Sequence, residues 1–505
     1  MNTLFSGLVV LAVLYVWSRH HKFRNAVLPP GPKPLPLVGN ILDLTARELW
    51  LRVEKWARCF GDIVYIHVFG QGLVFLNTQQ AAVDLLEKQG SIYSDKPSLV
   101  MAGELCGCEN MVAFTRYGDF ARRQRKLMHE ALGASAVRTF LPLLEIETHA
   151  LVRGIMADPK DYIGYIRKYA GGLTLLVIYG YRVTSNEDPY LMLAEECVDI
   201  LSNRIASGGG IWPVDIFPFL KHLPLWAPGS GFKHKAIEWR AKMEEFVEKP
   251  FQNLKEQMKN GTNVPCFVSH LMESSLERGD KAVDQQREFD VKWTANSMYS
   301  ASLDTTITVV QDFLLAMMAH PEVLRKAQEE IDRVVGPGRL PAFTDRPNLP
   351  YIDCVMSEVL RWGCPVPLDL WKMMFITACL SRKELWKMLR NEEVYPDAHE
   401  FKPERFLVEV DEATAKRRDP RNFVFGFGRR RCPGNHLIEQ SFWIVMTTIL
   451  ATLDISKAKD ENGNVLEPNV VYENSVFRSP STFQCDLRPR TEQALKIMRQ
   501  TADAH

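Results

Sequence analysis

The stretch FGFGRRRCPG, from Phe425 to Gly434, decides how the rest of the chain is interpreted. Three glycines and three consecutive arginines surround one cysteine, Cys432, and Pro433 follows it directly. Proline suits the first turn of a helix, because its missing N–H costs nothing there. The Cys432 sulfur would then face a helix N-terminus, where free amides and the helix dipole stabilise a thiolate. The pattern therefore predicts a cysteine that is held as an anion for chemistry.

A thiolate of this kind can be the axial ligand of haem iron, where it pushes electron density toward bound oxygen. Gly428 and Gly434 permit close approach to a flat macrocycle. Phe425 can shield the sulfur, and Arg430 can pair with a haem propionate. The stretch matches Phe-x-x-Gly-x-Arg-x-Cys-x-Gly at all five fixed positions. It resembles the haem-binding signature of the cytochrome P450 family, which implies haem b (iron protoporphyrin IX) with Cys432 as its axial ligand. The competing interpretation is a glycine-rich loop beside a helix.

Residues 300–318 form a long, largely apolar segment that the polar residues Asp304, Thr305 and Thr306 interrupt. The segment is similar to the family's oxygen-activation helix. That resemblance implies that Thr305 hydrogen-bonds the bound oxygen and that Asp304 feeds protons toward it. Ser302 stands where glycine is usual, which leaves open whether the helix is distorted there. A satisfied polar patch within a helix is the alternative.

Glu358 and Arg361 match the family's Glu-x-x-Arg motif, and a spacing of three residues puts both on one helix face. Two other pairs also fit this weak motif, Glu322–Arg325 and Glu330–Arg333. Position favours Glu358, because "FKPERF" at residues 401–406 and the cysteine stretch follow it in the family's order. The resemblance implies that Arg405 joins Glu358 and Arg361 in a buried charge network with a structural role beside the haem.

Residues 117–132 resemble the family helix that usually carries Trp-x-x-x-Arg. Arg125 fits a propionate partner, whereas Ala121 replaces the tryptophan. Nearby basic residues could form a docking face for a reductase, although a solvated basic face is an equal alternative. They are Arg122, Arg123, Lys126, Arg429 and Arg431.

Charge and cysteine content exclude several classes of protein. In 505 residues, Lys+Arg and Asp+Glu both total 61, so the chain has no basic excess of the kind that nucleic-acid binding requires. Ten cysteines form no disulfide framework by their spacing. We therefore expect no nucleic-acid partner and mostly buried or loop thiols in a reducing compartment.

The N-terminus predicts an uncleaved membrane anchor. An apolar, uncharged run at residues 4–17 precedes the basic residues 19–24, the reverse of the order in a cleaved signal peptide. Positive charge after the span keeps the bulk of the chain in the cytosol, and the endoplasmic reticulum bilayer is thin enough for a short span. The Asn260-Gly-Thr sequon would then never meet the glycosylation machinery.

The predicted organisation is a membrane anchor at 1–18, a basic linker and proline-rich hinge at 19–40, and a haem-binding monooxygenase domain at 41–505. Apolar residues at three- and four-residue spacing predict mostly helices, and residues 61–77 predict a strand hairpin around Gly70–Gly72. The fold class is therefore mainly α with small β-sheets (α+β). The resemblance implies the cytochrome P450 fold, preceded by one N-terminal transmembrane helix.

Residues 369–385 depart from the family. A strand pair with a Gly- and Pro-containing turn is usual there, but this segment lacks both residues and is shorter. We interpret it as a replaced segment. The missing strands normally line the substrate pocket and help to hold a propionate, for which Lys372 could substitute. This opens the possibility of an impaired or haem-deficient protein.

Taken as a whole, the chain resembles a fungal microsomal cytochrome P450, similar to basidiomycete enzymes labelled O-methylsterigmatocystin oxidoreductase-like. The resemblance implies insertion of one oxygen atom into a lipophilic secondary metabolite or xenobiotic, with electrons from an NADPH-dependent reductase. The substrate class is a terpenoid, a polyketide, a steroid-like or a polycyclic aromatic compound. We expect a monomer, with the substrate near residues 299–303, 366–368 and 475–477. The alternatives are an oxygen-independent haem-thiolate isomerase or dehydratase and a non-catalytic membrane protein.

Overall fold

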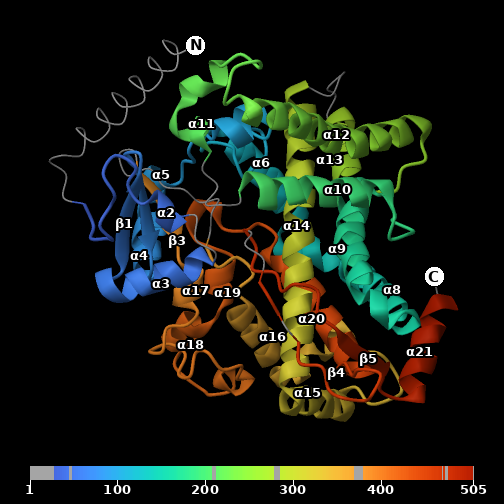
Figure 1. The fold of residues 1–505 in the computed structure, drawn as a ribbon. Coiled ribbons are helices and arrows are strands. Elements are labelled where there is room, and N and C mark those ends of the chain that lie inside the picture. The colour runs from blue at the N-terminus through green and yellow to red at the C-terminus, as the bar shows by residue number, and fades with distance from the viewer. Residues whose placement is uncertain are drawn as a thin grey trace.

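The computed structural model describes residues 28–44, 48–206, 212–277, 285–368, 379–468, 470–472 and 476–503. These ranges fold mainly into helices, with one three-stranded and one two-stranded sheet (Figure 1). The predicted fold class, mainly α with small β-sheets, is confirmed in that form. The predicted N-terminal anchor lies outside the described residues. Within those ranges no single helix is long and apolar enough to cross a membrane; α14 (Gln285–Ala319) and α15 (Pro321–Val334) meet that standard only together, across a 104° bend.

Helix α14 is the central element and runs through the molecule as a continuous helix of 35 residues (Figure 1). Its residues from Ile307 to Met318 are all buried, and a helix that is buried on every side belongs to the core. Helices α9 (Tyr162–Tyr179), α6 (Asp119–Leu132), α16 (Pro350–Gly363) and α20 (Asn435–Thr452) pack against it. The larger hydrophobic core forms around this helix.

The other α-helices surround this centre. They are α2 (Ile41–Leu44), α3 (Leu49–Phe60), α4 (Gln79–Ala82), α5 (Gly90–Tyr93), α7 (Ala134–Thr139), α8 (Leu141–Ala157), α10 (Pro189–Asp199), α11 (Pro213–Ile216), α12 (Gly231–Asn260), α13 (Phe267–Glu277), α17 (Leu385–Met388), α18 (Glu412–Arg418), α19 (Arg421–Val424) and α21 (Glu492–Asp503). Short π- and 3₁₀-helices connect them, at η1 (Val83–Lys88), η2 (Val100–Leu105), η3 (Pro159–Asp161), η4 (Ile200–Ile205), η6 (Pro218–His222), η7 (Phe343–Asn348), η8 (Pro403–Phe406) and η9 (Gly428–Arg430).

The predicted strand hairpin is confirmed. Strand β1 (Ile63–Val68) pairs antiparallel with β2 (Gln71–Leu76), and Val68 lies opposite Gln71. The two residues of the turn, Phe69 and Gly70, both have positive φ angles of 47° and 74°. A two-residue turn of this kind matches the right-handed twist of the strands it joins. The inner face of the hairpin packs in a second, smaller hydrophobic core with α3 and α17.

The structure corrects the expectation for part of the replaced segment. Residues Cys379–Lys383 form strand β3, which extends the sheet by pairing parallel with β2 from Gly72 to Leu76. Leu368 and Glu384 form an isolated antiparallel bridge across the segment. No Gly or Pro is required because the strand is registered by its neighbour in the sheet rather than by a local turn. Residues 369–378, including Lys372, lie outside the described residues. The second sheet pairs β4 (Leu453–Lys457) with β5 (Cys485–Pro489).

Candidate active site

The cysteine loop lies between α19 and α20. Its ends are joined by a backbone hydrogen bond in which the Cys432 N–H donates to the Phe425 carbonyl at 2.8 Å. This closes the loop into a compact arch at the N-terminal end of α20, whose first residue is Asn435. Cys432 is exposed on that arch and Phe425 is half-buried. Pro433, which is expected in the first turn of this helix, lies one residue before its N-cap, Gly434.

The two glycines of the signature have different surroundings. A side chain at Gly428, where φ is 61°, would lie 2.1 Å from the backbone oxygen of Leu86 in η1. Gly428 is therefore needed for packing of the loop against η1, and its positive φ is the unusual backbone angle that the sequence predicts there. A β-carbon at Gly434 would lie 3.8 Å from the Cys432 sulfur. Gly434 thus keeps space beside the proposed ligand atom.

The two arginines that are predicted to hold propionates lie close together, Arg430 within the cysteine loop and Arg125 on α6. Arg125 on α6 donates from Nη2 to the Arg431 carbonyl at 2.9 Å. Arg430 donates to the carbonyls of Ser94 at 3.1 Å and Thr115 at 2.9 Å, while its buried Nη1 has no partner among the described residues. Burial, followed by the positive charge of Arg125, lowers the pKa of Arg430 to about 10. Two half-buried arginines close together, one of them with a buried N–H that has no partner among the described residues, fit a carboxylate-bearing cofactor such as haem.

Lys96 is a neighbour of this cluster that the sequence reasoning missed. Its side chain is only 6% exposed, and its ammonium group donates to the Ala113 carbonyl. Lys96, Asp95 and Arg430 line a small pocket. The sequence gives little to indicate that Lys96 belongs to the site, because it shows only a lysine between Asp95 and Pro97.

The predicted catalytic pair lies on an open face of α14. Ala301 is exposed and Asp304 and Thr305 are half-buried, although Leu303 and Thr306 beside them are buried. The Thr305 hydroxyl donates to the Ala301 carbonyl one turn earlier, at 3.0 Å. The helix itself remains continuous through this stretch. An accessible face in the middle of a core helix is the arrangement that a cavity for a large planar group requires.

Ser302, which replaces the usual glycine, forms a hydrogen bond with Thr174 on the neighbouring helix α9. Its hydroxyl lies 2.8 Å from the Thr174 hydroxyl on α9 and 3.0 Å from the Tyr299 carbonyl, to which it can donate. Tyr299 itself is wholly buried against Tyr179 and Phe246. Its assignment to the substrate pocket is therefore corrected, because the helical twist turns it toward α9 and α12.

The other segments predicted to line the substrate pocket, residues 366–368 and 475–477, also contain both buried and half-buried side chains. Val366 is half-buried and Leu368 is buried, whereas Ser475 lies outside the described residues.

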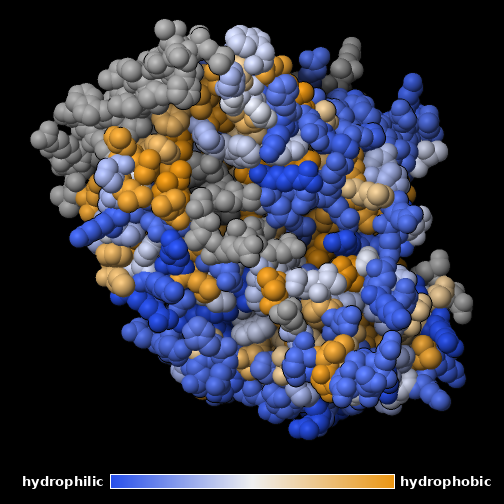
Figure 2. Space-filling model, viewed as in Figure 1, coloured by the Kyte–Doolittle hydropathy of each residue, from blue (hydrophilic) through white to orange (hydrophobic). Residues whose placement is uncertain are grey.

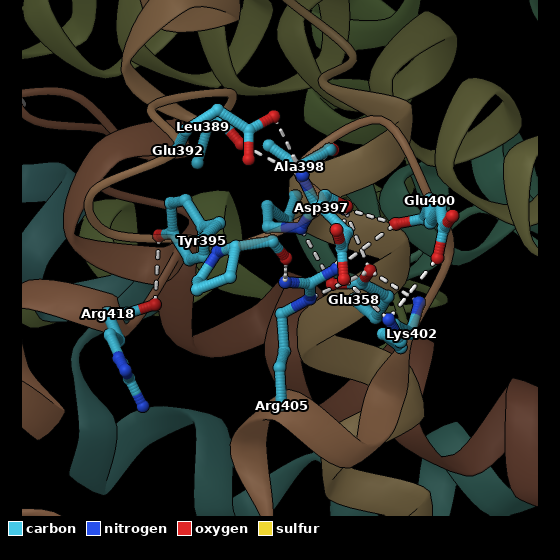
Figure 3. Close-up of polar contacts among 12 residues, drawn as sticks. Glu358, Leu389, Glu392, Tyr395, Asp397, Ala398, Glu400, Lys402, Arg405 and Arg418 are labelled. Carbon is cyan, nitrogen blue, oxygen red and sulfur yellow. Dashed lines mark hydrogen bonds and ion pairs between the residues drawn. The ribbon is translucent and has the colours of Figure 1, made fainter.

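The structure brings Glu358, Arg361 and Arg405 into one network (Figure 3). Glu358 and Arg361, both on α16, have fully buried side chains and pair through two hydrogen bonds of 2.7 and 2.8 Å. Arg405, from η8, donates to the same carboxylate at 3.3 Å, and so does the Lys402 N–H at 2.7 Å.

The network also fixes the irregular chain before η8. Arg361 donates to the carbonyls of Leu389 at 2.9 Å, Ala398 at 2.6 Å and Glu400 at 2.9 Å. Every donor of this buried guanidinium is therefore used, which offsets the cost of burying its charge. The consequence is that residues 389–405 are fastened to α16.

The five residues predicted to form a basic face lie on α6 and the cysteine loop. Arg122, Arg123, Lys126 and Arg429 are exposed, and Arg431 is half-buried. Arg122 pairs with Asp119 and Arg123 pairs with Asp290. Arg429 donates to the Tyr117 hydroxyl at 3.0 Å.

Comparison with known proteins identifies the family. A sequence model described as "Cytochrome P450" matches residues 29–376 and 383–484, which leaves out only a short part of the departing segment between them. The chain is 36% identical to cytochrome P450 monooxygenase claT of Ampulloclitocybe clavipes over the whole length of both proteins. It is 37% identical to cytochrome P450 monooxygenase 208 of Postia placenta, over 97% of this chain and 95% of that protein. It is 35% identical to cytochrome P450 monooxygenase CLM2 of Gibberella zeae, over 98% and 96% respectively.

These matches cover both sides of the departing segment, so they favour neither a haem-deficient protein nor an isomerase. The family implies a haem b cofactor, a reductase as redox partner and lipophilic substrates. The cysteine arch, the cations beneath it and the open face of α14 agree with that assignment. The chain therefore belongs to the cytochrome P450 family of haem-thiolate monooxygenases.

Proposed function

We propose that this protein inserts one oxygen atom from O2 into a lipophilic secondary metabolite or xenobiotic. Haem ligated by a cysteine thiolate supplies the activation of oxygen in such a reaction. Cys432 would be the ligand, and Arg125 and Arg430 would neutralise the carboxylates of the cofactor. The observation that carries this proposal is the buried Nη1 donor of Arg430, which has no partner among the described residues and lies close to the half-buried Arg125.

Within the site, Thr305 and Asp304 would handle protons. The Thr305 hydroxyl is held by the Ala301 carbonyl, which leaves its oxygen free to accept a hydrogen bond on the open face of α14. Asp304 is the adjacent acid and is half-buried, a position from which it can exchange protons with water. The exposed Ala301 methyl offers an apolar wall, which favours terpenoid, polyketide, steroid-like or polycyclic aromatic substrates.

Removal of the Thr305 hydroxyl is expected to divert electrons from product to hydrogen peroxide. In Thr305→Ala, proton delivery loses its last hydrogen-bonding group, and product formed per NADPH should fall roughly tenfold or more. The measurement is product and peroxide per NADPH consumed, with a reductase and a substrate that the parent protein oxidises. Thr306→Val, a change of the adjacent buried hydroxyl, should keep the parental ratio. Parental coupling in Thr305→Ala would contradict the assigned role.

We also propose that electrons enter through the exposed basic residues Arg122, Arg123, Lys126 and Arg429, with Arg431 at the edge. This surface lies on the loop that carries Cys432 and on the helix that carries Arg125. An acidic partner would be steered to it by charge. The Arg122 and Arg123 ion pairs are exposed and therefore weak enough to be exchanged for contacts with a reductase.

A single-pass anchor at residues 4–17 is proposed to hold the protein as a monomer on the endoplasmic reticulum, facing the cytosol. The described chain begins at Leu28, and exposed leucines follow closely, namely Leu35, Leu37 and Leu42. Figure 2 shows apolar surface gathered over this part of the molecule, around α2 and the β1–β2 hairpin. An apolar patch next to an anchor suits a surface that rests against a bilayer.

The orientation predicts that the natural Asn260 sequon stays unmodified. Asn260, Gly261 and Thr262 are exposed at the end of α12, so burial would not protect them. Expression in microsomes should give no glycosidase-sensitive mobility shift, whereas an N-terminal extension that carries a sequon should be glycosylated. Modification of Asn260 itself would overturn the cytosolic placement.

A further inference from the structure

A line of polar side chains continues along α14 beyond the predicted catalytic pair. Thr305, Thr308 and Asp312 follow one another at spacings of three and four residues. Residues at these spacings lie on one face of a helix, with neighbouring β-carbons about 5–6 Å apart. Thr305 is half-buried, while Thr308 and Asp312 are wholly buried. The line therefore leads from the open face of α14 into the core.

The middle of the line is a pair of hydroxyls. The Thr308 Oγ1 lies 2.5 Å from the Ser479 Oγ, and either atom can be the donor. A hydroxyl both donates and accepts, so a pair with no fixed direction can pass a proton along. Among the described residues, no direct hydrogen bond joins Thr308 to Thr305 or to Asp312. One bridging water at each gap would complete the connection.

The inner end of the line is a carboxyl group without a partner. Asp312 is 0% exposed, and neither carboxylate oxygen has a hydrogen-bond partner among the described residues. Arg478 donates instead to the Gly363 carbonyl at 2.8 Å, and Arg390 donates to the Trp362 carbonyl at 2.7 Å. The arrangement is therefore not a hydrogen-bonded ion pair, which is what a purely structural buried carboxylate requires.

The surroundings of Asp312 allow it to carry a proton near neutrality. Burial raises the pKa of Asp312 to about 7, against the opposing charges of Arg478 and Arg390. Two further titratable groups face it, the Cys364 thiol and the Tyr472 hydroxyl. Burial raises the pKa of each of these two groups, so they stay neutral.

Two further carboxyl groups, Glu384 and Glu54, act electrostatically in this region. Glu384 is wholly buried with one unpartnered oxygen, and burial, reinforced by the charge of Glu54, raises its pKa well above the usual value. Glu54 keeps 12% of its side chain exposed and pairs with the exposed Arg58 at 2.6 Å. Cys364 lies within the electrostatic reach of both Glu384 and Asp312, which places these two carboxyls in one neighbourhood.

We propose that Asp312 is an internal proton donor that supplies Thr305 through Thr308 and Ser479, as a second route beside Asp304. The carboxyl O–H bond of Asp312 breaks as its proton passes to a bridging water and then to the hydroxyl pair, which releases a proton toward Thr305. The carboxylate regains a proton from bulk water. No electron moves in these steps. Asp312 acts through other groups, so it is a positioning residue, and the inference rests on the proposed function of Thr305.

The test compares Asp312→Asn with Gln311→Leu, which alters a neighbouring buried polar side chain off this line. Each full-length protein is first reduced under carbon monoxide. A thiolate-type spectrum in both shows that the haem site is intact, and its loss from the parent protein would instead refute the proposed function. Peroxide released per NADPH is then measured on both sides of neutral pH and in heavy water. We expect Asp312→Asn to raise the peroxide fraction roughly three- to tenfold and to change its pH profile and solvent isotope effect. Gln311→Leu should match the parent.

A readout without turnover completes the test. Infrared difference spectra between acidic and alkaline samples should contain a protonated-carboxyl band that disappears in Asp312→Asn. Thr308→Val and Ser479→Ala each remove one hydroxyl of the proposed proton route and leave the Asp312 carboxyl in place. They therefore test the route even if Asp312→Asn fails to fold. They should raise the peroxide fraction and leave the infrared band in place. Parental peroxide fractions and isotope effects in these variants, or the absence of the carboxyl band, would overturn the inference.

Discussion

Cys432→Ser is expected to abolish the red-shifted carbon monoxide spectrum of the reduced protein and to reduce oxygenation to background. A serine hydroxyl is a far weaker acid than a thiol, and it supplies no soft anion to push electron density toward oxygen. The arch itself should persist, because it is closed by the backbone bond from Cys432 to Phe425. The measurements are the reduced carbon monoxide spectrum, the haem content and product formation with a reductase.

The exposed thiol of Cys59 provides a matched control for the Cys432→Ser substitution. Cys59 on α3 is exposed but lies outside the cysteine loop. Cys59→Ser should keep the parental spectrum and activity, which would separate the specific ligand from a general need for free thiols. Retention of the thiolate spectrum in Cys432→Ser would show that another residue binds the iron.

Arg361→Ala is expected to cause the largest loss of stability among single changes in this chain. The substitution leaves Glu358 buried without its two shortest arginine hydrogen bonds and leaves the carbonyls of Leu389 and Ala398 without this donor. Removal of one partner from a buried charge pair costs about 3–5 kcal/mol, a large part of the stability of an ordinary domain. Thermal or urea unfolding measures the loss, and soluble yield should fall with it.

The chain carries its own control for the Glu-x-x-Arg spacing. Arg333 pairs with Glu330 at 3.9 Å and at the same interval of three residues, but its side chain is 71% exposed. Arg333→Ala should therefore change the free energy of unfolding by only about 0–1 kcal/mol. Equal losses in the two variants would show that the motif, rather than its burial, sets the stability.

Local sequence patterns correctly predicted the structural features whose geometry depends on residues close together in the chain. The five fixed positions around Cys432 predicted the loop, because proline and glycine fix the backbone on both sides of the sulfur. Spacing of three residues predicted that Glu358 and Arg361 share a helix face, and alternation predicted the β1–β2 hairpin. The prediction of lost strands at 379–383 was wrong there, because a parallel neighbour, β2, supplies the pairing that a local turn would otherwise direct.

The sequence by itself determined the family and the cofactor and predicted the ligand, because a haem-thiolate loop needs specific residues within ten consecutive positions. Only the tertiary structure decided the contacts between distant segments. It placed Gly428 against the Leu86 carbonyl, Arg430 against Ser94 and Thr115, and Asp312 beside Arg390 and Arg478. The physical reason is that burial and charge pairing depend on which segments meet in the core, and that meeting leaves no periodic signal in any one of them.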